Sequence, residues 1–163
     1  GRLDEAEQEF QTARALRWEH GAKFENTMLL RGLAEVSLAR GDVLAAAEYA
    51  EQALAGLTDQ DEISRETVAA TLGKVRAAQG RADDAEALFR DSIEILERKE
   101  YRIDHALSLF KYGEALLLLN RPERARAPLE RARDLFAAIG ATHHLHETEA
   151  RLASAGGVAQ PAV

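Results

Sequence analysis

The chain has 163 residues, a length that fits one domain or a short array of repeats. It contains 32 Ala and 22 Leu but only 11 Val and Ile together, a balance that favours helix over strand. A net charge of −7 argues against a surface for nucleic acid or anionic lipid, and no apolar run approaches the ~20 residues that cross a bilayer. The absence of Cys excludes disulfides, thiol catalysis and Cys-based zinc sites. With no signal peptide in the chain, we expect a cytoplasmic location.

Hydrophobic periodicity and capping residues predict eight helices in the chain. Each candidate helix ends near a Gly, an Asn or a polar run, and the next begins a few residues later. The expected helices span residues 3–19, 24–40, 43–57, 62–79, 82–99, 103–119, 122–138 and 143–154.

Similar junctions recur along the chain every 39 or 40 residues. They are Gly1-Arg2, Gly41-Asp42, Gly80-Arg81 and Asn120-Arg121, and an Ala follows each at the same offset: Ala6, Ala46, Ala85 and Ala125. Gly and Asn tolerate the left-handed backbone conformation that ends a helix. Asp42 is placed to cap the next helix, and Pro122 stands where a first-turn Pro is tolerated. The regular spacing predicts helix hairpins that share one continuous core when stacked.

Residues inside the hairpins resemble the tetratricopeptide repeat family. The pairs Leu72-Gly73 and Tyr112-Gly113 match its pattern, as do Ala85, Phe89 and Ser92. The resemblance implies an all-α, right-handed superhelical stack of antiparallel hairpins with about eight helices. The period of 39–40 residues is longer than the family's usual ~34, which implies longer helices or loops.

The repeats place a single domain at residues 1–155. We expect a half repeat at 1–20, full repeats at about 24–58, 62–99 and 103–138, a terminal helix at 143–154, and a disordered tail at 156–163. The run from Ala125 to Ala153 is similar to the C-terminal repeat arrays of large bacterial signalling and transcriptional regulators. That likeness implies a sensor or scaffold part of such a regulator.

In such a stack the first helix of each hairpin lines the concave side. Side chains rotated away from the packed face point into this groove, and they offer charges, acceptors and apolar anchors to a peptide. The residues expected to bind a protein or peptide partner are Met28, Arg31, Glu35, Lys74, Phe110 and Glu114. The Lys/Asn set with which some family members grip a C-terminal carboxylate is missing, since Arg31, Glu35 and Ala70 occupy matching places.

Catalysis requires a nucleophile, a base and a stabilising group in one pocket, and the sequence shows no such combination. We therefore predict no enzyme, no catalytic residue and no cofactor. His143 and His146 share one side of a helix, but the second His of a zinc protease motif is missing, and we predict a capping turn without metal. The alternative function is a receptor for a small ligand or peptide pheromone that uses the same groove as an allosteric switch.

The first helix carries an apolar stripe formed by Leu3, Ala6, Phe10 and Ala13, at helical spacings of three and four. This helix corresponds to the second half of a hairpin, and a first half does not precede it in the chain. Repeat arrays need polar terminal caps. We therefore expect self-association through this open N-terminal helix.

Overall fold

The structure is a computed structural model that describes residues 2–18, 23–58 and 61–156, with side chains for residues 3–13, 27–58 and 61–156. These residues form an all-α stack without strands. The helices are α1 (Arg2–Trp18), α2 (Lys23–Arg40), α3 (Val43–Ala55), α4 (Glu62–Ala78), α5 (Ala82–Arg98), α6 (Arg102–Leu118), α7 (Pro122–Ile139) and α8 (Thr142–Gly156). Each begins and ends within two residues of its predicted position.

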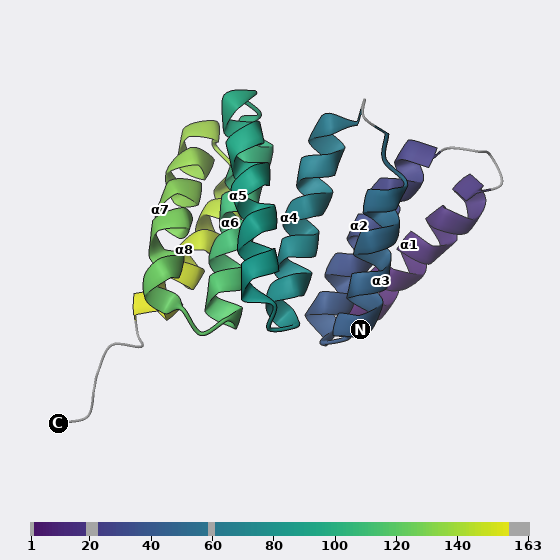
Figure 1. Cartoon of the computed structure of the whole chain (residues 1–163), viewed down its shortest axis with the longest axis horizontal. Coiled ribbons are helices and arrows are strands. Elements are labelled where there is room, and N and C mark those ends of the chain that lie inside the picture. Colours follow the sequence, from purple (N-terminus) through teal and green to yellow (C-terminus); the bar gives the residue numbers. More distant parts are fainter. Residues whose placement is uncertain (1, 19–22, 59–60, 157–163) are drawn as a thin grey trace.

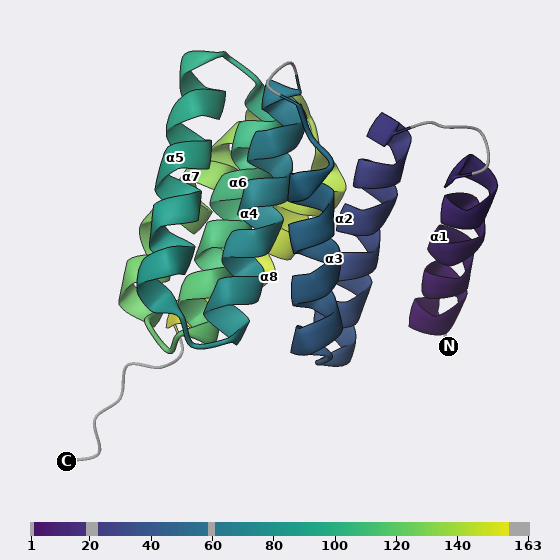
Figure 2. The same cartoon turned by 45° about the vertical axis from the view of Figure 1, so that its right-hand side comes forward.

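The helices stand side by side in a row, with α1 at one end and α7 and α8 at the other (Figures 1 and 2). Helices α2 and α3, α4 and α5, and α6 and α7 pack as consecutive antiparallel hairpins. The first helices of these hairpins also contact one another in succession, α2 with α4, α4 with α6, and α6 with α8. The fold is therefore a repeat stack of the tetratricopeptide type, as predicted.

Local chemistry sets the helix boundaries. Gly41, Gly80, Asn120 and Gly140 have φ angles of 81°, 74°, 56° and 74°, the left-handed conformation predicted for the first three. The Asp42 side chain accepts a hydrogen bond of 3.0 Å from the Ala45 amide and caps α3. Pro122 lies in the first turn of α7. Each of these turns is thus specified by one or two residues.

Glycines in two hairpins provide space for large side chains of the facing helix. A Cβ atom built on Gly73 would lie 2.8 Å from the nearest Phe89 ring atom, and one on Gly113 would lie 2.4 Å from Leu129 Cγ. Both distances are shorter than a carbon–carbon contact allows. Because Phe89 and Leu129 are fully buried, these two contacts fix how closely α4 packs on α5 and α6 on α7.

The C-terminal end differs slightly from the prediction. Helix α8 continues to Gly156, so the first residue of the expected tail is helical. The rest of that tail, residues 157–163, lies outside the described residues, as do Gly1 of the first junction and residues 19–22 between the first two helices.

Candidate functional site

A groove of about 930 Å³ runs across the first helices of the repeats near their C-terminal ends. Apolar side chains of α2, α4 and α6 line it together with charged side chains of α4, α6 and α8. The lining residues are Glu35, Leu38, Ala39, Gly41, Val43, Lys74, Ala77, Ala78, Leu107, Phe110, Lys111, Glu114, Leu117, Leu118, His144, Glu147, Arg151 and Ser154. Its volume lies within the range of ligand sites, and it is an open trough.

Four of the six predicted site residues line this groove: Glu35, Lys74, Phe110 and Glu114. Met28 and Arg31 line a separate hollow of about 60 Å³ between α2, α4 and α6. Lys111 borders both spaces and thus separates them. The predicted set is therefore divided between two adjoining depressions on the same side of the stack.

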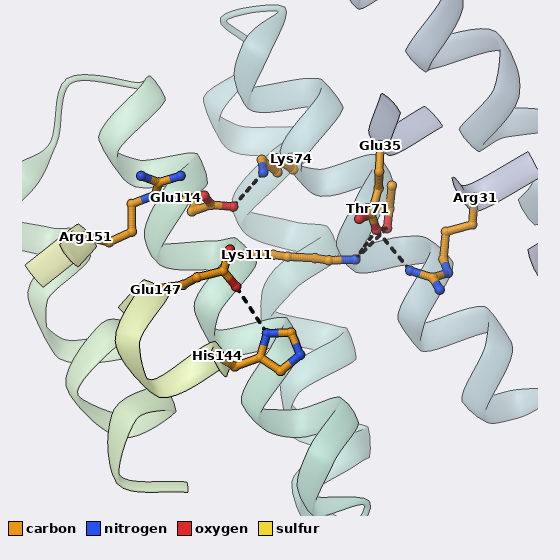
Figure 3. Close-up of polar contacts among 9 residues, drawn as sticks. All are labelled: Arg31, Glu35, Thr71, Lys74, Lys111, Glu114, His144, Glu147 and Arg151. Atoms are coloured by element: carbon orange, nitrogen blue, oxygen red, sulfur yellow. Dashed lines mark hydrogen bonds and ion pairs between the residues drawn. The ribbon is translucent and has the colours of Figure 1, made fainter. Parts of the chain in front are cut away.

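Glu35 is the centre of a polar cluster that joins three hairpins (Figure 3). Its Oε1 atom accepts hydrogen bonds from Arg31 at 2.9 Å, from the Thr71 hydroxyl at 3.0 Å and from the Lys111 ammonium at 2.5 Å. Lys111 also donates to Thr71 Oγ1 at 2.9 Å. Since these residues come from α2, α4 and α6, the cluster connects the first hairpin to the third across the second.

The electrostatics of the cluster favour the ion pair. Burial by itself would raise the pKa of Glu35, but the Lys111 and Arg31 charges and the Lys111 and Thr71 hydrogen bonds lower it to about 2. Burial lowers the pKa of Lys111, and the neighbouring Glu35 carboxylate opposes this shift. The Lys111 side chain is only 12% exposed, so Glu35 is the anion that keeps its ammonium charged.

A second cluster lies one repeat further along. Glu114 accepts a hydrogen bond of 2.5 Å from Lys74 through Oε2 and one of 2.9 Å from Arg151 through Oε1. Glu114 is 11% exposed, whereas Lys74 and Arg151 are more open. Figure 3 shows the three side chains converging from α4, α6 and α8. Lys74 is therefore already paired, and so is Arg31 through Glu35, although both were predicted to offer charge to a partner.

The sequence prediction did not include Thr71, Lys111 and Arg151. All three carry polar atoms into the clusters, and they occupy positions 71, 111 and 151 of α4, α6 and α8, each 40 residues after the last. Polar residues repeated at the period of the fold on one helix position were the signal that could have identified them.

The histidines gather at the edge of the groove. His144 lines it, stacks on Phe136 with ring centroids 5.1 Å apart, and has its Nδ1 atom 3.3 Å from Glu147. His143 also lies near this carboxylate, at 3.5 Å, and it is 82% exposed. Across the described residues no three His, Asp or Glu side chains come together to hold a metal ion. The same part of the chain contains no helix long and apolar enough to cross a membrane.

Comparison with known proteins agrees with this geometry. Residues 64–138 match the family model described as tetratricopeptide repeat. This range includes most of α4 and all of α5 and α6, and it ends one residue before the end of α7. The part of the chain that carries the two glycine-based hairpins is therefore similar to the tetratricopeptide repeat.

The chain is also similar to a curated protein, the large ribosomal subunit protein bL9 of Nitrosococcus oceani. The two are 36% identical over 97 residues, which cover 60% of this chain and 61% of that protein. The similarity thus extends over less than two thirds of either chain.

Proposed function

We propose that this chain is a non-enzymatic interaction module that binds a peptide or a partner protein in the groove of α2, α4, α6 and α8. Tetratricopeptide-type repeats generally mediate protein–protein interaction, and the match at residues 64–138 supports this reading. The observation that carries the proposal is the groove itself, an open trough of about 930 Å³ that the alternate helices α2, α4, α6 and α8 line with both apolar and charged side chains.

The wider context is part of the same proposal. The module would act as the sensor or scaffold of a larger bacterial signalling or transcriptional regulator, in the cytoplasm, with neither cofactor nor metal. Nucleic acid is not among the proposed partners, because a net charge of −7 opposes binding to phosphates. For that reason we do not propose a ribosomal role for this chain.

Site-specific photo-crosslinking tests the groove. A crosslinking amino acid at position 118 would report on the groove, because Leu118 lines it and is 55% exposed. The same amino acid at position 90 is the control, because Arg90 is exposed on α5 and lies outside the groove. We expect a discrete crosslinked partner in a lysate of the source organism from position 118 alone. Equal products from both positions would contradict the proposal.

The alternative is a receptor for a small ligand or peptide pheromone. The volume of the groove lies within the roughly 300–1,000 Å³ of ligand sites, but its open shape fits the interaction module better. A receptor of this kind would enclose its ligand and change the arrangement of its hairpins on binding. A small molecule that changes the small-angle scattering profile of the chain would support the receptor, and its absence together with a stable complex with a partner protein would favour the interaction module.

Self-association through α1 also remains a proposal. Phe10 packs over Gly32 of α2, and Arg40 forms ion pairs with Asp4 and Glu7, so α2 covers part of the apolar stripe. Leu3 stays 41% exposed. Light scattering over a concentration series tests this: association that Leu3→Gln weakens is expected, and a strict monomer at high concentration would exclude it.

A further inference from the structure

The groove differs from an ordinary charged binding surface because its lysines and its arginine are already paired with carboxylates of the chain. Three cationic and three anionic side chains line it, so its formal charge is zero. Lys111 holds Glu35, Lys74 and Arg151 hold Glu114, and His144 contacts Glu147. A charged ligand group that displaced Lys111 from Glu35, or Lys74 or Arg151 from Glu114, would break an existing ion pair, and this cost offsets the new contact.

The walls of the groove also offer few backbone groups to a ligand. They are formed by helices, in which amides and carbonyls bond to one another along the helix. An extended peptide pairs its backbone with a sheet edge or with free polar side chains, and neither is available along these walls. Backbone that loses water in the groove must therefore be satisfied within the ligand itself, and a helix achieves this.

The remaining surface is apolar. Leu107, Phe110, Leu117 and Leu118 of α6 face Leu38 of α2 across the short side chains of α4. Leu118 is the most exposed of the large apolar residues that line the groove, at 55%. Leu38, Leu107, Phe110 and Leu117 are half-buried, so they form an apolar floor beside the exposed Leu118.

Resting on the proposed function, we infer that the occupant of the groove is an amphipathic helix. It inserts a row of apolar side chains, at positions i, i+3 or i+4, and i+7, and leaves the ion pairs of the groove intact. Recognition is then insensitive to salt, because no charge pair is made or broken.

Selection from a random peptide library displayed on phage tests this inference. The intact chain is the target, and Leu118→Ser is the counter-target. Leu44→Ser is the matched control, since Leu44 is 72% exposed and does not line the groove. We expect the selected peptides to carry apolar residues at helical spacing and to become helical on binding. Both variants should melt like the wild type, because each alters an exposed side chain.

The affinity of a selected peptide completes the test. Leu118→Ser should weaken binding about tenfold, as expected for an apolar anchor, and Leu44→Ser less than about twofold. A change from 50 to 500 mM salt should alter Kd less than about threefold. The inference would be overturned if the selected peptides depend on the groove but are acidic, and if their Kd rises steeply with salt. The proposed function would then still hold. Failure to enrich any peptide that distinguishes the wild type from Leu118→Ser would overturn the proposed function itself.

Discussion

The first hairpin and the two that follow it pack by different means. At equivalent positions, α4–α5 has Gly73 against Phe89, and α6–α7 has Gly113 against Leu129. Hairpin α2–α3 has Ala34 and Ala50 there, and both are fully buried. The family match begins at residue 64 and so covers only the hairpins with the glycines. A hairpin of this stack can thus form without the pairing of a glycine and a large side chain.

The first hairpin lacks a large side chain at these positions, and large residues of the neighbouring helix α4 fill the space instead. Ala34, Ala46, Ala47 and Ala50 belong to one buried cluster with Leu72 and Val75 of α4. Small side chains let α2 and α3 approach closely, and the next repeat supplies the volume. The stability of hairpin α2–α3 should therefore depend on α4. Hairpins α4–α5 and α6–α7 contain the large residue at this contact themselves.

The largest expected effect tests this difference directly. Phe89→Ala should destabilise the chain by about 3–5 kcal/mol, because it removes a fully buried ring and leaves a cavity. At the equivalent position Ala50→Gly should cost about 1 kcal/mol, mostly helix propensity. Urea denaturation monitored by circular dichroism measures both. Similar losses at the two positions would show that the hairpins pack alike.

The glycine side of the contact gives the next effect. Gly113→Ala should destabilise by about 1–3 kcal/mol despite the better helix propensity of Ala, because the new methyl group would clash with Leu129. Gly156→Ala is the matched control, since Gly156 is helical and has nothing within 4 Å of its Cβ position. The control should be neutral or slightly stabilising. Leu129→Ala combined with Gly113→Ala should cost less than the sum of the single changes.

A third prediction concerns the link between the two regions, the ion pair of Glu35 on α2 and Lys111 on α6. The pKa of Glu35 is lowered to about 2, so its stabilising contribution is complete above about pH 4.5 and is lost as the pH falls through about 2. Glu35→Gln should cost about 1 kcal/mol at pH 7, a modest value because 40% of the side chain is exposed.

The pH dependence separates this effect from simple repacking. The difference between Glu35→Gln and the wild type should shrink when urea denaturation is repeated at successively lower pH below 4.5. Exposed Glu48 has no partner among the described residues, and Glu48→Gln should leave stability unchanged. A Glu35→Gln difference that is the same at pH 7 and pH 3 would contradict the electrostatic explanation.

The helices and their ends were predictable because the signals are local. Gly41, Gly80 and Asn120 each specify a turn by their own backbone preference, and Asp42 specifies a cap. Phe110 and Glu114 could be placed toward the groove because the repeat fixes which face of α6 is packed. In these cases a residue and its near neighbours contain the information.

The pairing of charges in the groove was not predictable in the same way. Glu35 and Lys111 are 76 residues apart, and their contact depends on how far each hairpin is rotated against the last. Two long side chains then meet across α4, and Thr71 bridges them. Side-chain reach and the rotation of the stack are properties of the packed molecule. The sequence therefore predicted that Arg31 and Lys74 offer charge to a partner, but not that each forms an ion pair within the chain.

The left-handed residue in the turn between α5 and α6 was not predicted, and it gives the smallest expected effect. Glu100 adopts a φ of 60°, the same left-handed conformation as Gly41, Gly80 and Gly140. A Cβ atom makes this conformation costly, and Glu has no local hydrogen bond to offset it as Asn has. Its amide nevertheless bonds to the Glu97 carbonyl, and the Tyr101 amide bonds to the Leu96 carbonyl, as at the glycine turns.

Glu100→Gly should therefore stabilise the chain by about 0.5–1 kcal/mol, since relief of the strain exceeds the entropy that Gly adds to the unfolded state. Asn120→Gly should gain less, because Asn already tolerates a φ of 56°. Lys99→Gly is the control: Lys99 has a φ of −87°, so Gly brings only the entropic cost and should destabilise. Thermal and urea unfolding of the three variants rank them. A Glu100→Gly variant no more stable than Lys99→Gly would mean that the left-handed turn is held without strain and that glycine at the other junctions serves another purpose.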